Sequence, residues 1–321
     1  IKAPYQYEAQ LYAQKQLTPE WSGLVQLGWV DLRRIVEDTC YGGGVQSYAQ
    51  SQGYAGYTQD NSTCWLVNPG ERFTLKRDYN GDGSVEPLSI PGAAIGLPKP
   101  KHKYYNLKLG LTHASTPAEP YFLNLSYTYA REYGNTNGLI DEERRNAGWI
   151  GQTAAFNYPG VMIGSNGNLA GDIRHSFTAT GTYDFTNGLS LGGVFTAHSG
   201  APTSCIGSYP DPNDPAYTHL GAQSHFCDGE VAKQGDGKRL PFFWQLDLSA
   251  TYDWKINASN DLSLQLRVNN VTNRQGTIDM NQVYDTGTLV DGGNAIHSVN
   301  YHVPTWQLPR TTTLALRYTF L

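Results

Sequence analysis

The connections between the strand-like segments of this chain alternate strictly between short and long. Nine segments show apolar and polar residues in turn with a period of two, which is the pattern of β-strands with one apolar face. These segments are 5–17, 21–35, 103–114, 121–133, 173–185, 189–199, 242–256, 262–272 and 310–320. Short turns alternate with long loops at 36–102, 134–172, 200–241 and 273–309. This order predicts an antiparallel up-and-down meander, all its short turns at one end, as in a transmembrane β-barrel. A β-sandwich rarely keeps that rule, because its Greek-key connections mix loop lengths.

The hydropathy of the chain is compatible with such a barrel. Mean hydropathy is -0.46 and no run of eighteen apolar residues occurs, so the sequence predicts no transmembrane helix. In 242–256, Leu246, Leu248 and Ala250 alternate with Gln245, Asp247 and Ser249. We expect the apolar set to face lipid and the polar set to face a hydrated interior. A β-sandwich would turn the apolar set inward, and alternation alone does not distinguish the two.

Aromatic residues favour the membrane interpretation because they gather at strand ends. Tyr5, Tyr105, Phe185, Trp254 and Tyr318 stand at such ends. Rings at both ends of the strands are typical of the girdles that barrels place at the two membrane–water interfaces. The alternative is a set of ordinary core aromatics.

The charged fraction of 16% and the net charge of -5 provide no basic patch, so we expect no nucleic-acid partner.

Four cysteines form two pairs that are close in sequence. Cys40 is near Cys64, and Cys205 is near Cys227, each pair in a polar, Gly-rich loop. An even count in loops predicts two disulfides and an oxidising compartment, with the pairing inferred from proximity alone. Metal binding is the weaker interpretation of the cysteines, since no Cys-x-x-Cys occurs.

The start of the sequence, "IKAPYQYEAQ", has no basic or apolar leader, so we expect any signal peptide to be absent or removed.

The stretch "RDYNGDGSVEP" (77–87) places an oxygen-bearing side chain on every second residue. The candidate calcium ligands are Asp78, Asn80, Asp82, Ser84 and Glu86. Calcium prefers several oxygen ligands, and a glycine turn at Gly83 would let the loop wrap around it. A complete EF-hand needs Glu at loop position twelve, where this chain has Ser89. We therefore expect a structural calcium that braces loop 36–102, and the alternative is an Asx-turn that binds no ion.

Catalytic residues are not predicted. The "HSGAP" stretch around Ser199 lacks the Gly-x-Ser-x-Gly nucleophile motif, and the histidines form no His-Glu-x-x-His. The long loops are rich in aromatic residues that either bind ligands or pack the loops together. They are Tyr41, Tyr48, Tyr54, Tyr57, Trp65, Trp149, Phe156, Tyr158, Tyr209, Tyr217, Tyr284, Tyr301 and Trp306.

The C-terminal motifs resemble those of TonB-dependent outer-membrane receptors. "LSLQLRVNNVTNRQ" (262–275) looks like their penultimate strand, and "RTTTLALRYTF" (310–320) like their last strand, with Phe320 as the aromatic signal for barrel assembly. "GDIRHSFTATGTYDFTNGLSLGG", "HSGAPTSC" and "NPGE" resemble the Oar-like branch of this family. The resemblance covers residues 1–321 as the C-terminal part of such a receptor. Leu321 follows the terminal aromatic, which is a departure.

The resemblance carries expectations about the whole receptor. Family barrels have about twenty-two strands around an N-terminal plug. This chain would supply nine strands of a partial barrel and no plug. The resemblance implies a location in a Gram-negative outer membrane and contact with lipid and lipopolysaccharide. It also implies uptake of an unidentified ligand, powered by a periplasmic energy-coupling protein. The alternative function is a non-transporting barrel that serves as an adhesin or a scaffold for surface-protein partners.

Overall fold

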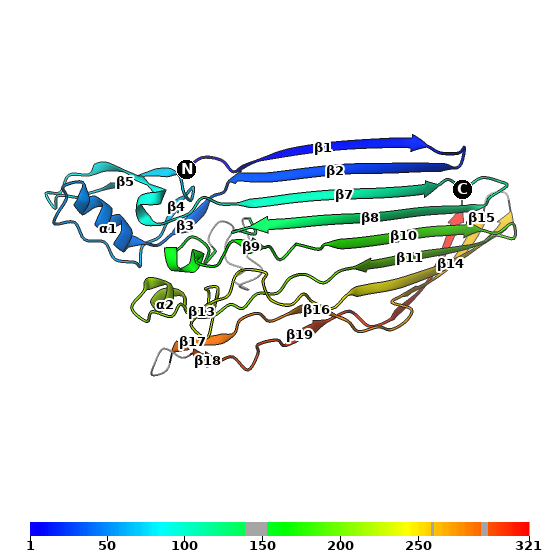
Figure 1. The fold of residues 1–321 in the computed structure, drawn as a ribbon. Helices are drawn as coiled ribbons and strands as arrows, with labels where there is room; N and C mark the ends of the chain where they lie inside the picture. The colour runs from blue at the N-terminus through cyan, green and yellow to red at the C-terminus, as the bar shows by residue number, and fades with distance from the viewer. Residues whose placement is uncertain (139–152, 258–259, 290–294, 321) are drawn as a thin grey trace.

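The structure is a computed structural model that describes residues 1–138, 153–257, 260–289 and 295–320. Its main feature is one antiparallel sheet that curves into an open wall (Figure 1). Nine strands follow one another along the wall in chain order, and the short β9 pairs with one of them, β8. The predicted meander is confirmed. No helix among the described residues is long and apolar enough to cross a bilayer.

The strands of the wall lie close to the segments expected from the sequence. They are β1 (Tyr5–Gln16), β2 (Trp21–Arg34), β7 (His102–His113), β8 (Tyr121–Gly134), β10 (His175–Asp184), β11 (Leu189–His198), β14 (Phe243–Asn257), β15 (Asn260–Asn269) and β20 (Thr311–Phe320). The largest difference is in the eighth strand, which was expected at 262–272 and ends at Asn269.

Asn270 explains the early end of β15. Its backbone is left-handed, with φ of 49°, which a continuing strand does not allow. Its side-chain nitrogen donates to the carbonyl oxygens of Arg274 (2.8 Å) and Leu308 (2.9 Å). Asn273 accepts a hydrogen bond of 2.9 Å from the backbone N–H of Arg310. These asparagines therefore join the end of β15 to the start of β20.

The strand register collects the apolar residues on one face of the wall. Leu191 lies opposite Ala250, which lies opposite Leu266, which in turn lies opposite Leu314. The neighbouring row on the other face holds Ser190, Thr251, Gln265 and Ala315. Leu248, Leu266 and Leu316 are exposed by 44%, 41% and 68%. The apolar row is thus not packed inside a dry core.

Exposed aromatic side chains mark both ends of this wall. Tyr5, Tyr7 and Tyr105 are exposed near the long loops, and Phe185, Trp254 and Phe320 near the short turns. Phe320 is the last residue of β20, and Leu321 lies outside the described residues. The wall is not closed, because β1 and β20 stand at opposite ends of the strand order.

The long loops contain secondary structure of their own. The first loop holds β3 (Glu37–Thr39), α1 (Gly42–Ser51), β4 (Trp65–Val67), β5 (Arg72–Arg77), β6 (Glu86–Pro91) and η1 (Gly92–Ile95). The others hold η2 (Pro159–Met162), β9 (Gly167–Asn168), α2 (Pro215–Leu220), β12 (Phe226–Cys227), β13 (Glu230–Val231), β16 (Thr277–Met280), β17 (Asp285–Leu289), β18 (Ala295–His297) and β19 (Pro304–Trp306).

The helix α1 was not predicted from the sequence. Its first three residues are glycines, which are poor helix formers and hide the helical pattern. Close packing explains them in part. A Cβ at Gly42 would lie 1.6 Å from the carbonyl oxygen of Asp60, and one at Gly44 would lie 2.4 Å from the ring of Tyr41.

Candidate functional site

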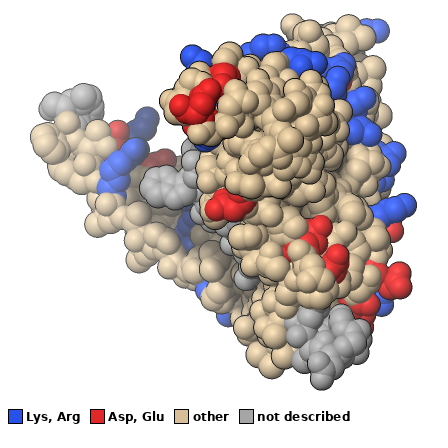
Figure 2. Space-filling model, turned by 90° about the vertical axis from the view of Figure 1, so that its left-hand side faces the viewer, with Lys and Arg blue, Asp and Glu red and all other residues tan. Residues whose placement is uncertain are grey.

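The long loops gather at one end of the wall, opposite the short turns. Figure 1 shows α1, α2 and the hairpin of β17 and β18 at this end, while the hairpin of β16 and β19 leads toward it from the wall. Figure 2 views the same end, where Lys and Arg side chains gather along one margin and uncharged residues cover most of the remainder. This loop assembly is the candidate functional site.

The first and second loops share a hydrophobic core. Residues of the first loop supply most of it, including Val45, Tyr79 and Ile90, each no more than 1% exposed. Phe156 and Met162 of the second loop pack into the same cluster. Burying large side chains contributes about 1.5–3 kcal/mol each, so the two loops stabilise one another.

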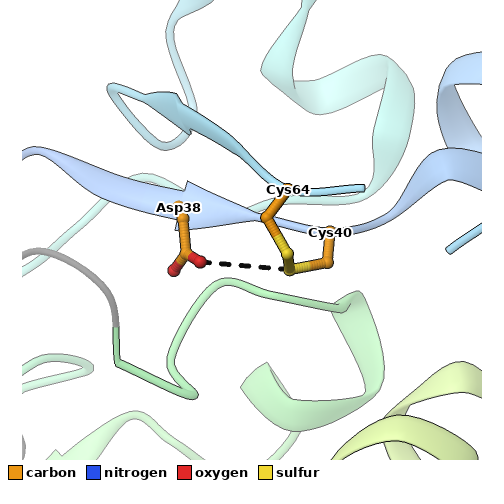
Figure 3. A group of neighbouring side chains, drawn as sticks. All are labelled: Asp38, Cys40 and Cys64. Atoms are coloured by element: carbon orange, nitrogen blue, oxygen red, sulfur yellow. Dashed lines mark hydrogen bonds between the residues drawn. A yellow bond between two sulfur atoms is a disulfide. The ribbon is translucent and has the colours of Figure 1, made fainter. Parts of the chain in front are cut away.

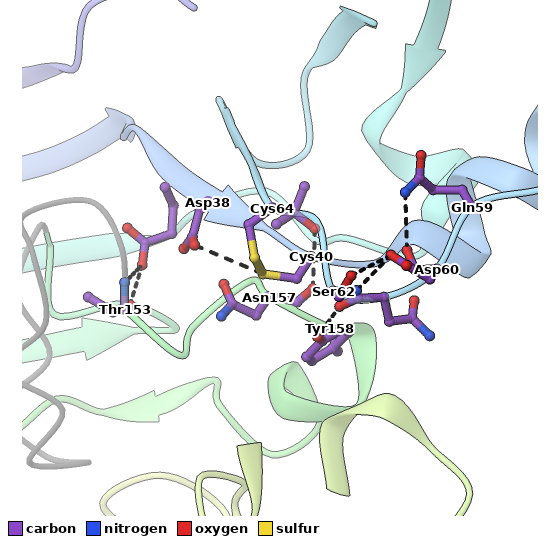
Figure 4. The surroundings of a disulfide bond; sticks show 12 residues. Asp38, Cys40, Gln59, Asp60, Ser62, Cys64, Thr153, Asn157 and Tyr158 are labelled. Carbon is purple, nitrogen blue, oxygen red and sulfur yellow. Dashed lines mark hydrogen bonds between the residues drawn. A yellow bond between two sulfur atoms is a disulfide. The ribbon is translucent and has the colours of Figure 1, made fainter. Parts of the chain in front are cut away.

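A disulfide between Cys40 and Cys64 stands beside this core (Figures 3 and 4). It closes a segment with a sequence separation of 24, and a bridge of this length stabilises by about 3 kcal/mol through the unfolded chain. Cys40 is buried against Tyr158 and Val161 of the second loop and Ala216 of the third. The disulfide therefore lies where three loops meet.

A buried carboxylate also joins the first two loops. Glu37 of β3 is 1% exposed, and its Oε1 accepts a hydrogen bond of 2.7 Å from the backbone N–H of Thr153. The hydroxyl of Thr153 donates to the same oxygen. Nearby, the backbone N–H of Cys40 donates to the carbonyl oxygen of Asn157 at 3.1 Å. Polar contacts thus continue across the join between the loops (Figure 4).

Asp38, Cys40 and Cys64 come together, but their chemistry does not suit a metal ion. Figure 3 shows the Asp38 carboxylate facing the disulfide, with Oδ2 at 4.0 Å from the sulfur of Cys40. Sulfur in a disulfide carries no proton, so the approach of Asp38 to Cys40 is a contact and no hydrogen bond. Cysteine binds metal ions as a thiolate, and a disulfide provides no thiolate. Burial raises the pKa of Asp38 to about 6, partly opposed by a backbone hydrogen bond.

The predicted calcium loop is the tip of the hairpin formed by β5 and β6. Asp78 accepts hydrogen bonds from the backbone N–H groups of Gly81, Asp82 and Gly83. Glu86 accepts from the backbone of Tyr79 and the amide of Asn80, and Ser84 donates to both Asp82 and Glu86. Within the described part of the chain, the carboxylates of Asp78, Asp82 and Glu86 do not converge within 4.8 Å of one another. Calcium binding stays a prediction.

A second disulfide lies within the third loop, and a buried aspartate joins the third loop to the fourth. Cys205 is bonded to Cys227, with a sequence separation of 22. Asp285 of the fourth loop is 3% exposed, and its two oxygens accept hydrogen bonds from the backbone and hydroxyl of Ser208, at 2.7 and 2.8 Å. Direct hydrogen bonds therefore join the third and fourth loops.

A cavity of about 670 Å³ opens between the third and fourth loops. Its lining includes Lys233, Lys238 and Arg239 from the stretch "KQGDGKR" (233–239), and Tyr301 and His302 from the fourth loop. Sequence reasoning missed this site. The available signal was three cations set around two glycines in an otherwise weakly charged chain.

The loop aromatics divide between packing and lining. Tyr57, Phe156 and Tyr158 are buried in the loop cores. Tyr41, Tyr48, Tyr54, Trp65 and Tyr209 pack against those cores. Tyr301 lines the cavity, Trp306 is 55% exposed, and Trp149 lies outside the described residues. Packing therefore accounts for most of the aromatics that the sequence analysis left open.

Comparison with known proteins supports the resemblance inferred from the motifs. No family model matches the chain. The chain is similar to the TonB-dependent transporter Oar of Myxococcus xanthus, with 26% identity over 211 residues. The match covers 63% of this chain and 18% of Oar, so the chain spans less than a fifth of that relative. The similarity confirms the resemblance to Oar-like TonB-dependent transporters and the location in the outer membrane of a Gram-negative bacterium.

Three solved structures have a similar course of the chain. The outer membrane transporter YddB from Escherichia coli is 10% identical with a TM-score of 0.49, covering 100% of this chain and 33% of that chain. The ferric-catecholate import receptor Fiu from E. coli K12 is 14% identical with a TM-score of 0.47, covering 100% and 28%. The ferripyoverdine receptor of Pseudomonas aeruginosa is 11% identical with a TM-score of 0.44, covering 98% and 26%.

Proposed function

We propose that this chain forms part of the wall and the outer loops of a receptor that takes up a ligand across the outer membrane. The similarity to Oar, a TonB-dependent transporter, supports this role. The observation that carries the proposal is the loop assembly, in which shared cores, two disulfides and buried carboxylates stabilise the long loops and the third and fourth loops enclose a cavity. Binding residues on loops held by a rigid scaffold are a common arrangement for ligand capture.

Transport by such a receptor requires an energy source, since the outer membrane has none of its own. A periplasmic energy-coupling protein is the partner that this role implies, and it would act on the intact receptor. The ligand would cross unchanged, so the proposal assigns no catalytic residue to the chain.

Two further partners follow from the surface of the wall. The apolar row through Leu266 and Leu314 would contact membrane lipid. Lys103 and Arg131 lie near the loop end, opposite Tyr133 and Tyr105 in the strand register. In this role the loops would face the cell exterior, and these two cations would meet the phosphates of lipopolysaccharide.

Solute depletion tests the transport role without knowledge of the ligand. Cells with and without the intact protein are given a defined mixture of solutes, and mass spectrometry follows the loss of each from the medium. We expect at least one solute to be depleted only by energised cells that carry the protein, and a protonophore to abolish this difference. Identical depletion by both strains, together with altered attachment to surfaces, would instead favour the adhesin or scaffold function.

A further inference from the structure

The cavity between the third and fourth loops has the size of a small-molecule site. Its volume of about 670 Å³ falls within the range of roughly 300–1,000 Å³ that is typical of ligand pockets. One side is formed by residues 203–205 and 231–239, and the other by Met280, Tyr301 and His302. The disulfide from Cys205 to Cys227 anchors the first side.

Hydrogen bonds fix the backbone of the "KQGDGKR" loop from several directions. The N–H of Gln234 donates to the carbonyl oxygen of Gly164 (2.9 Å), that of Gly235 to the hydroxyl of Ser204 (2.8 Å), and that of Gly237 to the carbonyl oxygen of Thr203 (2.9 Å). Gly235 has φ of 66°, and a Cβ there would lie 2.2 Å from the carbonyl oxygen of Asn168. The loop is thus held in one conformation before any ligand arrives.

This fixed loop presents positive charge to the cavity. Lys233 and Lys238 are exposed, and neither forms an ion pair with any residue that the structure describes. Arg239 is paired with the fully buried Asp172, which is also paired with Arg174 at 2.7 Å. One carboxylate shared by two guanidiniums leaves a net positive charge, so Asp236, the one acid among the described lining residues, is outweighed.

The opposite side offers an aromatic surface. The rings of Tyr301 and His302 are stacked, with centroids 3.8 Å apart and an angle of 25°. The rings of Tyr301 and Tyr284 form a T-shaped pair with a centroid distance of 5.0 Å. His302 has φ of 63°, which is uncommon outside glycine, and its N–H donates to the carbonyl oxygen of Asn281 at 2.9 Å. The rings are therefore positioned by their backbone and neighbours.

We infer that this cavity binds a small anionic ligand that carries a carboxylate on a ring with one flat, apolar face. Lys233 and Lys238 would hold the carboxylate, and Tyr301 and His302 would pack against the ring. Acidic oligosaccharides combine both properties, because a sugar ring has a face of C–H groups and a uronate has a carboxylate. The inference names the ligand class of the receptor proposed above and rests on that role.

Calorimetry on the intact protein in detergent tests the inference, with trigalacturonate as the probe, maltotriose as the neutral control and citrate as the control without a ring. We expect trigalacturonate to bind, its affinity to fall with added salt, and both controls to bind more weakly. The double variant K233Q/K238Q should weaken trigalacturonate binding about tenfold. This loss is near the upper end of the binding free energy that two exposed charge contacts contribute. Lys76→Gln, an exposed lysine on β5 away from the cavity, is the matched control and should change nothing.

Several results would overturn the inference. They are no binding of trigalacturonate, equal binding of maltotriose or citrate, or equal loss of affinity in K233Q/K238Q and K76Q. Tyr301→Leu should weaken trigalacturonate more than citrate, and equal effects would remove the aromatic part of the site. If trigalacturonate binds but energised cells do not deplete it from the medium, the transport role is contradicted while the ligand class of the cavity is retained.

Discussion

The hydroxyl of Tyr158, on the second long loop, donates a hydrogen bond of 2.9 Å to the carbonyl oxygen of Asn61 on the first. The two residues are 97 positions apart, and Asn61 lies within the segment closed by the disulfide from Cys40 to Cys64. Figure 4 shows Tyr158 reaching this segment from its own loop. The bond indicates that the first two loops behave as one body.

Removing this bond should loosen the join. We expect Tyr158→Phe to lower the local free energy of opening by about 1 kcal/mol, the usual net worth of one hydrogen bond. Amide hydrogen exchange of residues 59–64, followed by mass spectrometry, should become about fivefold faster. Tyr48→Phe is the control, since that hydroxyl makes a long, exposed hydrogen bond of 3.4 Å. Similar exchange in both variants would speak against a shared loop body.

The pKa of Asp38 makes the loop body sensitive to pH. Because burial raises it from 3.8 to about 6, the folded loop holds this proton more tightly than the unfolded chain. Stability from this group is therefore present below about pH 4 and is lost as pH rises through about 6. We expect Asp38→Asn to remove this part of the pH dependence and to stabilise the loops at pH 7, as measured by limited proteolysis across a pH series.

Asp60 provides a control of opposite sign for that experiment. Hydrogen bonds from the side chain and backbone of Ser62 lower the pKa of Asp60, so its charged form is favoured in the folded loop. Asp60→Asn should therefore give no gain at pH 7. If both variants respond alike, or if Asp38→Asn weakens the loops at pH 7, the assignment for Asp38 is wrong.

Calcium should protect the hairpin of β5 and β6 if its tip binds the ion. Asp78, Asp82 and Glu86 now accept hydrogen bonds from the loop itself, and an ion would have to draw their oxygens together. We expect added calcium to slow proteolysis of residues 72–91 and a chelator to reverse this effect. Asp78→Asn should abolish the response. The same cleavage rate with calcium and with chelator would leave the loop as an Asx-turn.

Two glycines provide a matched test of the cavity loop. Gly235 and Gly229 both have positive φ, 66° and 77°, so alanine is strained at either position. Only at Gly235 would the new methyl group clash, whereas nothing lies within 4 Å at Gly229. We expect Gly235→Ala to weaken trigalacturonate binding at least tenfold and Gly229→Ala to change it by less than twofold. Equal effects would show that crowding at Gly235 does not position the lysines.

The wall could be predicted from the sequence and most of the loop structure could not. Period-two alternation places residues such as Leu264 and Gln265 on opposite faces, and this signal is local. The end of β15 was misplaced because Asn270 adopts a left-handed backbone to reach Arg274 and Leu308, which requires the neighbouring connection. The helix α1 was missed because its glycines serve contacts with distant residues such as Asp60.

The cavity shows the same limit. Lys233 and Tyr301 are separated by a strand pair and two loops, and only the folded loops bring them to one site. The loop aromatics were ambiguous for a similar reason, since burial of Phe156 depends on the first loop. Residue type alone did not distinguish a core ring from one that lines a cavity.

The orientation of the two faces of the wall is the central claim, and spin-label accessibility tests it most directly. Labels at Leu266→Cys and Gln265→Cys, adjacent residues on opposite faces of β15, are placed in the intact protein after the native cysteines are confirmed to remain oxidised. The protein is then reconstituted in lipid. We predict that oxygen, which concentrates in lipid, relaxes the label at 266, and that a water-soluble nickel chelate relaxes the label at 265. Equal responses at both positions, or the reverse pattern, would contradict the account.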